Sequence, residues 1–392
     1  MKKVPRLRFR GFSEDWELCK LGEESDVRDG THDSPKYFDD GYPLVTSKNL
    51  KDFGLDLSDV SLISYKDFKS INKRSKVDIG DILFGMIGTI GNPVQIFRDD
   101  FAIKNVALIK EQRKILNGFL IHILKSPVFD RYIRNENAGG TQKFLALSKV
   151  RGFEFLRPNI EEQVRIGNLF KQIDNTITLH QRKLDQLKEL KKAYLQLMFP
   201  KKDETVPRVR FADFEDDWQL CKLGETFSII MGQSPNSENY TENPDDYILV
   251  QGNSDMKNNK VVPRIWTTQV TKKAEKGDLI LSVRAPVGEI GKTDYNVVLG
   301  RGVAAVKGND FIFQQLRKMK DSGYWTRYST GSTFESINSN DIKEALINIP
   351  NKDEQQKIGD LFTHLDDAII LNQNKLNQLK SLKKSYLQNM FI

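Results

Sequence analysis

The residues of this chain that could bind a nucleotide phosphate or a metal do not form a recognisable catalytic site. The tripeptide Gly291-Lys292-Thr293 resembles the end of a phosphate-binding loop, in which the lysine and the hydroxyl residue contact phosphates and Mg²⁺. That loop needs a glycine five positions before Gly291, where this chain has Pro286, so we expect a strand-loop turn instead. The histidines and cysteines, which show no metal-ligand spacing, are His32, His122, His180, His364, Cys19 and Cys221. We therefore predict no metal site and no catalysis by this chain alone.

Polar side chains at the ends of predicted strands suggest another chemistry, the recognition of nucleic-acid bases. Thr46-Ser47-Lys48-Asn49 follows an apolar run in the first half of the chain, and Gln251-Gly252-Asn253-Ser254 follows the corresponding run in the second half. Side chains of these types, together with arginine, read hydrogen-bond patterns on base edges or bind phosphates. Arg284 ends a further strand at a place where the first half offers Met86. For any single residue a solvated loop position is the alternative, so the prediction depends on their placement together.

The candidate DNA-binding residues fall into one set in each half of the chain. In the first half they are Lys36, Thr46, Ser47, Lys48, Asn49, Thr89, Lys104, Asn105, Thr141, Gln142 and Lys143. In the second half they are Gln251, Asn253, Ser254, Lys257, Arg284, Arg301, Ser332 and Thr333.

The composition is that of a folded, moderately basic protein. The 392 residues are 39% hydrophobic, and 60 Lys and Arg against 53 Asp and Glu give a net charge of +7. The excess of positive charge favours a polyanionic partner. No apolar run approaches the roughly 20 residues of a membrane span, and there is no apolar signal core near the N-terminus. We therefore expect a soluble cytoplasmic protein with buried, reduced cysteines.

Two blocks of the sequence occur twice, and the segments between them differ. Residues 4–23 return as 206–225 with 14 of 20 positions identical, and residues 162–199 return as 354–391 with 23 of 38 identical. The intervening segments, 24–156 and 226–348, have diverged. A chain that repeats its ends and varies its middles indicates a duplicated support that carries two different recognition parts.

The second repeated block predicts two long helices. Asn159 and Asn351 are suitable N-caps, and each is followed three residues later by a glutamate that we expect to return to the cap as in a capping box. Apolar residues then recur at 4-3-4-3 spacing, as in a coiled-coil seam. We predict an antiparallel helix pair whose interface consists of Ile166, Phe170, Ile173, Ile177, Leu184, Leu187, Tyr194, Ile358, Phe362, Leu365, Ile369, Leu376, Leu379 and Tyr386. The alternative is two separate helices, each packed on its own domain.

The varied segments read as compact α+β heads, because short β-rich runs are punctuated by Gly and Asp in the same order in both. The predicted fold class is α+β, with two pseudo-twofold-related heads separated by the helix pair. The predicted domains are a first recognition domain at 1–156, a central helical spacer at 157–202, a second recognition domain at 203–348 and a C-terminal helical spacer at 349–392.

The order of these features resembles the specificity subunit of type I restriction-modification systems. Each varied segment closes with a Gly- and Thr-rich turn, then an apolar strand, a proline and an acidic-acidic-Gln helix start. The residues are Gly139-Gly140-Thr141-Gln142, Pro158 and Glu161-Glu162-Gln163, and again Gly331-Ser332-Thr333, Pro350 and Asp353-Glu354-Gln355. The resemblance implies two target-recognition domains that each read one half of a bipartite double-stranded DNA site, with the helices fixing the spacer.

The resemblance also implies partners and cofactors that this chain does not bind itself. Two methyltransferase subunits would dock on the helices and bring S-adenosylmethionine, and restriction subunits would bring ATP and Mg²⁺. The chain itself would be a non-catalytic subunit. One departure is that Met86 stands where the second head has the basic Arg284. The alternatives are a coiled-coil scaffold protein that does not bind DNA and, more remotely, an ATPase based on Gly291-Lys292-Thr293.

Overall fold

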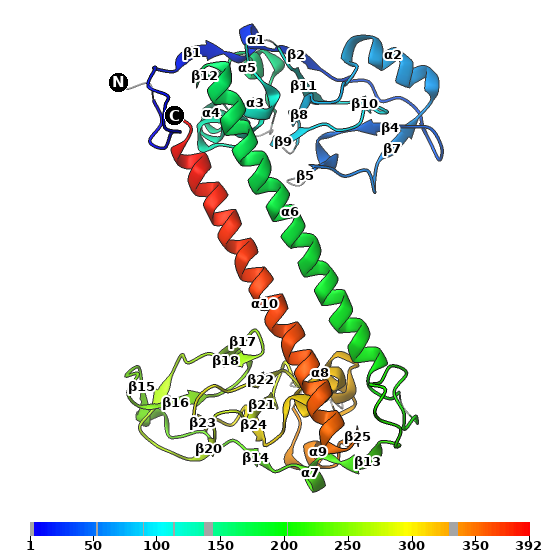
Figure 1. Cartoon of the computed structure of the whole chain (residues 1–392), viewed down its shortest axis with the longest axis vertical. Helices are drawn as coiled ribbons and strands as arrows, with labels where there is room; N and C mark the ends of the chain where they lie inside the picture. Colours follow the sequence, from blue (N-terminus) through cyan, green and yellow to red (C-terminus); the bar gives the residue numbers. More distant parts are fainter. Residues whose placement is uncertain are drawn as a thin grey trace. The chain divides into compact units, whose positions relative to one another are not determined.

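The computed structural model describes residues 4–51, 54–88, 90–112, 114–136, 144–201, 203–328 and 336–392. The chain divides into two compact units, and both borders between them fall inside long helices, α6 (Ile160–Leu197) and α10 (Lys352–Asn389) (Figure 1). Unit 1 contains Met1–Arg182 and Gln373–Ile392, and unit 2 contains Lys183–Asn372. Among the helices of the described segments, none combines the length and the apolar character that a membrane crossing requires.

Unit 1 is an α+β structure built on two four-stranded sheets, with the strand orders β10-β4-β7-β3 and β2-β11-β8-β9. Two-stranded sheets join β1 to β12 and β5 to β6. The strands are β1 (Glu17–Lys20), β2 (Asp26–Asp29), β3 (Tyr37–Phe38), β4 (Tyr42–Val45), β5 (Leu50–Lys51), β6 (Gly54–Leu55), β7 (Ser61–Ile63), β8 (Ile82–Gly85), β9 (Gly91–Gln95), β10 (Ala102–Ile103), β11 (Val106–Lys110) and β12 (Glu154–Arg157). The helices, besides parts of α6 and α10, are α1 (Leu21–Glu24), α2 (Tyr65–Ser75), α3 (Asn117–Leu124), α4 (Pro127–Glu136), α5 (Leu147–Arg151) and the 3-10 turn η1 (Ser47–Asn49).

Unit 2 has the same class of structure with larger sheets. A six-stranded sheet has the order β14-β24-β21-β22-β18-β17, a five-stranded sheet has the order β15-β19-β16-β23-β20, and β13 pairs with β25. The strands are β13 (Gln219–Lys222), β14 (Ile229–Met231), β15 (Tyr240–Thr241), β16 (Tyr247–Val250), β17 (Met256–Lys257), β18 (Lys260–Val261), β19 (Trp266–Thr267), β20 (Lys272–Ala274), β21 (Leu279–Ser282), β22 (Ile290–Lys292), β23 (Val297–Leu299), β24 (Val303–Val306) and β25 (Leu346–Ile349). The helices are α7 (Leu223–Thr226), α8 (Asp310–Asp321), α9 (Ser339–Lys343) and the turns η2 (Ser237–Asn239), η3 (Asn253–Asp255) and η4 (Tyr324–Tyr328).

Each unit has its own hydrophobic core, and matching positions of the repeat fill both. In unit 1 the ring of Phe119 lies 6.0 Å from that of Trp16 and 5.7 Å from that of Phe391. The C-terminal end of the chain therefore completes the core of unit 1. The same three positions of the repeat lie together in the core of unit 2: Phe311, Trp218 and Phe199.

Both long helices begin at the asparagine caps that the sequence predicts. The side chain of Asn159 accepts a hydrogen bond from the backbone N–H of Glu162 at 3.0 Å, and Asn351 does the same for Glu354 at 2.9 Å. Because these backbone N–H groups have no partner inside the helix, each cap satisfies one of them.

The expected return of the glutamate side chain to the cap is wrong. The buried carboxylate of Glu162 instead accepts two hydrogen bonds from Arg8, each at 2.8 Å, and one from the indole N–H of Trp16 at 3.3 Å. Arg210 holds Glu354 in the same two-pronged way, at 2.7 and 2.8 Å. A bidentate charged partner satisfies a buried carboxylate better than one backbone N–H does. The first repeated block is thereby fastened to the start of the long helix in each unit.

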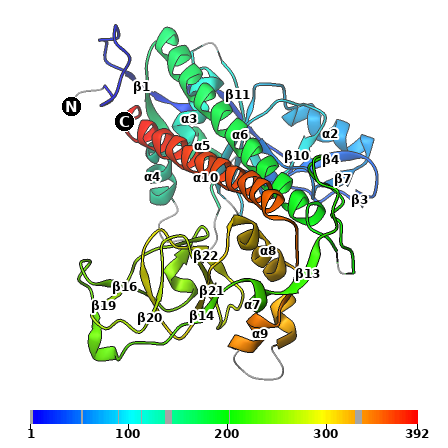
Figure 2. The same cartoon turned by 60° about the horizontal axis from the view of Figure 1, so that its bottom comes forward.

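Within unit 1, the first part of α6 and the last part of α10 run side by side and antiparallel (Figures 1 and 2). The rings of Phe170 and Phe391 lie 5.8 Å apart. Asp174, four residues after Phe170, forms an ion pair with Lys383, which lies eight residues before Phe391. A later residue of α6 thus contacts an earlier residue of the C-terminal segment, as the predicted antiparallel pair requires.

Within unit 2 the remaining parts of the two helices show the same antiparallel order. Phe199, just beyond the end of α6, lies 6.0 Å from Phe362 ring to ring. Lys191, earlier in α6, pairs with Asp366, which lies later in α10. Lys191 and Lys383 occupy stripe positions, between Leu187 and Tyr194 and between Leu379 and Tyr386. Each is paired with an aspartate of the other helix, which favours one register over others.

The predicted interface residues are all at least half-buried. Eight of them are buried: Ile166, Phe170, Ile173, Leu184, Ile358, Phe362, Leu365 and Leu376. Six are half-buried: Ile177, Leu187, Tyr194, Ile369, Leu379 and Tyr386. Some of them, such as Ile166 and Phe362, also belong to the core of their unit. The contact that each residue makes across the whole helix pair stays a prediction.

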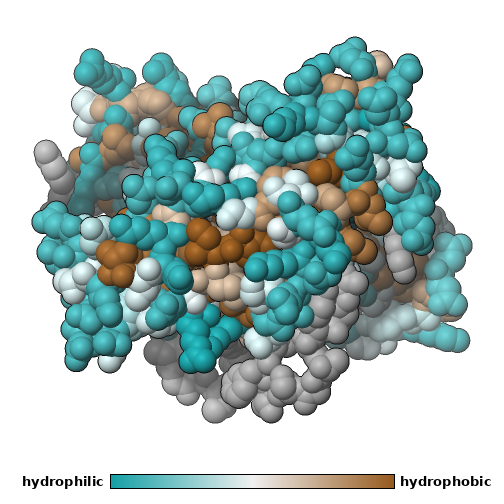
Figure 3. Space-filling model, turned by 90° about the horizontal axis from the view of Figure 1, so that it is seen from below, coloured by the Kyte–Doolittle hydropathy of each residue, from teal (hydrophilic) through white to brown (hydrophobic). Residues whose placement is uncertain are grey.

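Some large apolar side chains remain exposed at matching positions of the two units. Leu18 of β1 is 61% exposed and Leu220 of β13 is 62% exposed, although both strands are paired within small sheets. Figure 3 shows one face of the molecule, on which several brown apolar areas lie among teal hydrophilic side chains. The repeated block therefore leaves the same leucine open to contact in both units.

Candidate functional site

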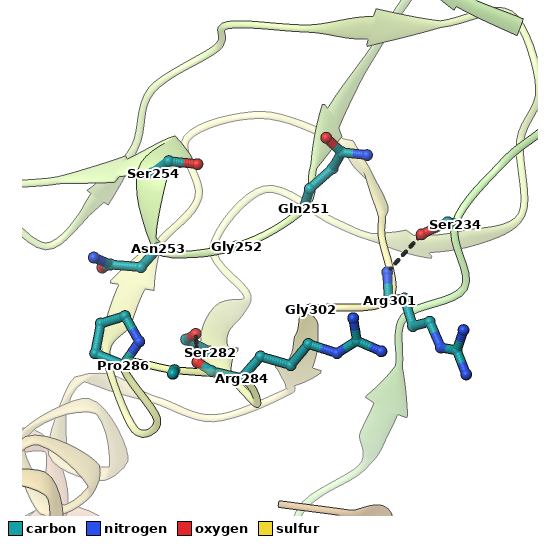
Figure 4. Close-up of a pocket in the computed structure, with 11 residues that line it drawn as sticks. Ser234, Gln251, Gly252, Asn253, Ser254, Ser282, Arg284, Pro286, Arg301 and Gly302 are labelled. Atoms are coloured by element: carbon teal, nitrogen blue, oxygen red, sulfur yellow. Dashed lines mark hydrogen bonds between the residues drawn. The ribbon is translucent and has the colours of Figure 1, made fainter. Parts of the chain in front are cut away.

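A hollow of about 600 Å³ opens on unit 2 where the ends of several strands meet (Figure 4). The loop after β16 forms one wall, the turn after β21 forms another, and the β23–β24 connection closes the third side. The lining residues are Ser234, Gln251, Gly252, Asn253, Ser254, Ser282, Arg284, Ala285, Pro286, Arg301 and Gly302. Five of these were predicted from the sequence to bind DNA: Gln251, Asn253, Ser254, Arg284 and Arg301.

Asp255 holds the β16 loop in shape. Its buried carboxylate accepts hydrogen bonds from the backbone N–H groups of Gln251, at 2.7 Å, and Gly252, at 3.3 Å. Arg264 donates to the same carboxylate at 2.8 Å and to the hydroxyl of Ser254 at 3.1 Å. The charge of Asp255 is thus balanced, and the loop that presents Asn253 is fixed before any ligand arrives.

Several polar side chains of the hollow already have partners within the unit. The amide of Gln251 donates to the hydroxyl of Tyr240 at 2.8 Å, and the hydroxyl of Ser282 donates to the backbone oxygen of Arg284 at 2.9 Å. The hydroxyl of Ser234 accepts from the backbone N–H of Arg301 at 3.1 Å. These bonds position the walls of the hollow.

Three side chains of the hollow remain available. Asn253, Arg284 and Arg301 have no side-chain hydrogen bond or ion pair with any other residue that the structure describes, and both arginines are exposed. Figure 4 shows the side chain of Arg284 extending toward that of Arg301. None of the described lining residues is acidic, so the hollow combines two unneutralised positive charges with a free amide. This combination suits a polyanion whose bases carry hydrogen-bond acceptors.

Unit 1 has an equivalent of Arg284, but it is one residue later than the sequence comparison suggested. Ile87 forms an isolated antiparallel bridge with Phe144, and Arg284 forms one with Ser336, 192 positions after Phe144. Ile87 and not Met86 therefore corresponds to Arg284.

Strand pairing next to the bridges gives the same correspondence. Gly85 lies opposite Val106 in unit 1, and Ser282 lies opposite Val303 in unit 2. Ile87 lies two residues after Gly85, and Arg284 lies two residues after Ser282. The expectation that Met86 stands in the place of Arg284 is therefore wrong, and aligning Gly80-Asp81 with Gly277-Asp278 already places Ile87 opposite Arg284 in the sequence.

The loop after β4 in unit 1 is held largely by its own side chains. The buried amide of Asn49 accepts from the N–H and hydroxyl of Thr46, at 3.0 and 3.1 Å, and donates to the backbone oxygens of Asp56 and Asp59, at 3.1 and 3.2 Å. These contacts favour a structural role for Asn49. Ser47 donates to the backbone oxygen of Ile87 at 2.8 Å, and Lys48 lies 3.6 Å from the exposed carboxylate of Asp59.

A charged cluster stands beside this loop in unit 1. The two ring nitrogens of the exposed His32 lie 2.8 Å from the Asn105 side-chain oxygen and 2.9 Å from a carboxylate oxygen of Asp29, which also pairs with Arg74. The contacts with Asn105 and then Asp29 raise the pKa of His32. Burial alone would raise the pKa of Asp29, but hydrogen bonds from His32 and Arg74 outweigh it and lower that pKa.

His32 was not among the residues predicted to bind DNA. A single histidine after a short polar run carries no distinctive signal, and only the fold brings it to Asn105. The neighbouring predicted residues also have partners: Lys104 donates to the hydroxyl of Ser34 at 2.6 Å, and the ammonium of Lys36 lies 5.5 Å from the ring centroid of Phe38.

The other predicted DNA-binding residues are not gathered at the hollow. Lys257 is exposed on β17 and does not line it. The remaining predictions fall outside the described residues: Thr89, Thr141, Gln142, Lys143, Ser332 and Thr333. For all candidate residues, contact with DNA stays a prediction.

The tripeptide that resembles a phosphate loop forms a strand and its turn, as expected. Lys292 belongs to β22 and its ammonium pairs with Asp310 at 2.7 Å. Thr293 is buried, and its hydroxyl donates to the backbone oxygen of Tyr295 at 2.8 Å. Neither side chain is presented for a phosphate. Over the described segments, His, Cys, Asp and Glu form no group of three or more that could hold a metal ion.

Comparison with known proteins points to one family. The family described as "Type I restriction modification DNA specificity domain" matches residues 13–189 and 215–381. The putative type I restriction enzyme MjaX specificity subunit of Methanocaldococcus jannaschii is 26% identical over 95% of this chain and 92% of its own length. The type I restriction enzyme EcoBI specificity subunit of Escherichia coli is 32% identical over 34% of this chain and 29% of its own.

A solved structure has a similar fold. The S subunit of a type I restriction-modification system from M. genitalium superposes with a TM-score of 0.68, covers 99% of both chains and is 15% identical in sequence. At that identity the similarity concerns the fold alone, and it extends over the whole of both chains.

Proposed function

The chain belongs to the family of type I restriction-modification DNA specificity subunits, and we propose on that premise that its two heads each read one half of a bipartite DNA site. In this proposal residues 1–156 and 203–348 are the recognition domains, and 157–202 and 349–392 are the helical spacers. The chain supplies recognition and no bond-making chemistry of its own.

One observation carries the proposal for the second head: the hollow with its free Asn253, Arg284 and Arg301. Asparagine is suited to adenine, and arginine to guanine or phosphate. Because the hollow lies where strand ends meet, these side chains stand on short segments that directly follow or join strands, which places them more accurately than a long loop would. The net charge of +7 adds a general attraction to the DNA backbone.

The long helices suit the task of setting the distance between the half-sites. Each is a single helix of 38 residues, which corresponds to roughly 57 Å at 1.5 Å per residue. The lysine–aspartate pairs Lys383–Asp174 and Lys191–Asp366 discourage sliding of one helix along the other within each unit. A fixed register gives the unread spacer a fixed length.

The proposal includes partners. Methyltransferase subunits that bring S-adenosylmethionine would dock along the repeated helices, and restriction subunits that use ATP and Mg²⁺ would join them in the nuclease. Two copies of the repeated block make two equivalent docking places, so two methyltransferase subunits are expected.

The test is selection of binding sites from a library of random DNA duplexes, with the full chain in complex with its methyltransferase subunits. The proposal predicts enrichment of one sequence made of two defined halves around an unread spacer of constant length. A gel-shift assay should then show tighter binding to this duplex than to a scrambled one. Equal binding to all duplexes would reject DNA recognition and favour a scaffold role.

A further inference from the structure

The two heads differ at one structurally equivalent position in a way that bears on which base each can read. Ile87 and Arg284 occupy equivalent positions. Ile87 forms the isolated bridge that follows β8 in unit 1, and Arg284 forms the isolated bridge that follows β21 in unit 2. The guanidinium group of Arg284 has no partner within the described chain, whereas Ile87 offers only an apolar side chain.

The backbone that carries Arg284 is fixed from both sides. Its carbonyl oxygen accepts from the hydroxyl of Ser282 at 2.9 Å, and its bridge with Ser336 ties it to the next segment. The preceding residue, Val283, donates to the backbone oxygen of Gly302 at 2.9 Å and accepts from the N–H of Ile337 at 3.0 Å. A side chain on so constrained a backbone can present its two parallel N–H groups in one direction, which bidentate contact with a planar acceptor pair requires.

Arg301 has a different setting in the same hollow. It is flanked by Gly300 and Gly302 in the turn between β23 and β24, and its side chain is exposed. Its backbone N–H is held by Ser234 at 3.1 Å, so the turn itself has a defined place. An arginine on an exposed turn is suited to a phosphate, which accepts from many directions and carries no sequence information.

We propose that Arg284 reads a guanine in the half-site of the second head, while Arg301 contacts the adjacent phosphate backbone. This inference rests on the proposed function and adds the identity of a base to it. Guanine offers two acceptors, O6 and N7, on its major-groove edge, and arginine is their commonest bidentate partner. The first head lacks this guanine contact, because Ile87 can form only apolar contacts, such as one with a thymine methyl group.

The experiment compares Arg284→Ala with Arg301→Ala, two substitutions that each remove one positive charge from the same exposed hollow. The full chain, in complex with its methyltransferase subunits, is used to select duplexes from a library with both half-sites randomised. Arg284→Ala is expected to lose preference for guanine at one position of one half-site, by roughly tenfold or more, and to keep the other positions. Arg301→Ala is expected to weaken binding to all sequences equally and to lower the slope of log affinity against log salt by about 1.

A gain-of-function variant, Ile87→Arg, serves as the reverse test. It should add a guanine preference at one position of the other half-site, because it places a guanidinium group at the equivalent bridge. Thermal unfolding of all three variants at the wild-type temperature shows that they are folded.

The results separate the inference from the function on which it rests. If the unmodified complex selects a bipartite sequence but Arg284→Ala weakens all sequences uniformly, the guanine contact is refuted and the proposed function stands. If the selected second half-site contains no G·C pair at any required position, the guanine contact is refuted as well. If the unmodified complex selects no sequence, the proposed function itself fails.

Discussion

The fastening of the first repeated block to the start of each long helix allows one prediction to be worked out in detail. In unit 1 the carboxylate of Glu162 is fully buried and accepts hydrogen bonds from both the guanidinium group of Arg8 and the indole N–H of Trp16. Replacing Glu162 with Ala leaves the guanidinium group of Arg8, whose side chain is only 13% exposed, without its partner. Removing one partner of a buried ion pair costs about 3–5 kcal/mol of stability.

Unit 2 supplies a matched variant, Glu354→Ala, whose cost should be smaller. Arg210 keeps a second hydrogen bond, to the backbone oxygen of Asp216 at 2.6 Å, after Glu354 is removed. The indole N–H of Trp218 has no hydrogen-bond partner among the described residues, so Glu354→Ala removes no hydrogen bond from it. In unit 1 the indole of Trp16 would be newly unsatisfied, which costs about 1–3 kcal/mol. We therefore expect Glu162→Ala to destabilise its unit by about 1–3 kcal/mol more than Glu354→Ala destabilises the other.

Hydrogen-exchange mass spectrometry can measure both effects, because it reports the free energy of opening for peptides from each core separately. Glu161→Ala is the control, since Glu161 is exposed and, among the described residues, its ion pair is with the exposed Arg165. That control should change stability by less than about 0.5 kcal/mol. Equal losses from Glu162→Ala and Glu354→Ala, or a larger loss from the latter, would refute the reasoning about the indole.

Three further predictions concern single elements of the two units. Burial lowers the pKa of His122 well below its usual value, so unit 1 should lose about 1.4 kcal/mol of stability for each pH unit below about 6.5, where the unfolded chain takes up a proton and the folded chain does not. His122→Gln, which copies the matching Gln314 of unit 2, should remove that loss in unfolding curves recorded on both sides of this pH; a variant as acid-sensitive as the wild type would contradict it. Burial, followed by the positive charge of Arg317, lowers the pKa of Lys191 to about 8. If Lys191 is replaced, Asp366 still has an ion-pair partner in Arg317, at 3.4 Å. Lys191→Met should therefore change the free energy of unfolding by less than about 2 kcal/mol in denaturant titrations, whereas Asp366→Ala should cost more because it leaves Lys191 buried and unpaired; the opposite order would overturn this account of the pair. Finally, one added heptad in each of α6 and α10 lengthens them by about 10.5 Å and should extend the unread spacer by about three base pairs in the modified motif, without altering either half; an unchanged spacer would show that the helices do not set it.

The long helices could be predicted from sequence because their signals are local. The caps Asn159 and Asn351 and the 4-3-4-3 stripe lie within a few turns of each other in the chain, so spacing alone identifies them. The partners of Glu162 and Glu354 could not be predicted in this way. Arg8 is 154 residues away from Glu162, and only the tertiary fold brings the two together.

The partners of the candidate DNA-binding side chains could be predicted less fully, for a related reason. Residue type places Asn49 and Asn253 in the same class, but Asn49 is buried with its amide bonded inside the loop, whereas the Asn253 side chain is free among the described residues. Which polar groups are already satisfied depends on neighbours that are distant in sequence. The correspondence between Ile87 and Arg284, in contrast, follows from aligning Gly80-Asp81 with Gly277-Asp278, and the bridges agree with it.

The central claim, that each head independently reads one half of a split site, is tested most directly by exchanging one head. A chain in which 24–156 is replaced by the corresponding segment of another family member is expressed with the methyltransferase subunits, and the modified motif is read from the host genome. We predict that one half of the motif changes, while the other half and the spacer length stay as in the unmodified chain. A motif altered in both halves would contradict independent reading by two heads.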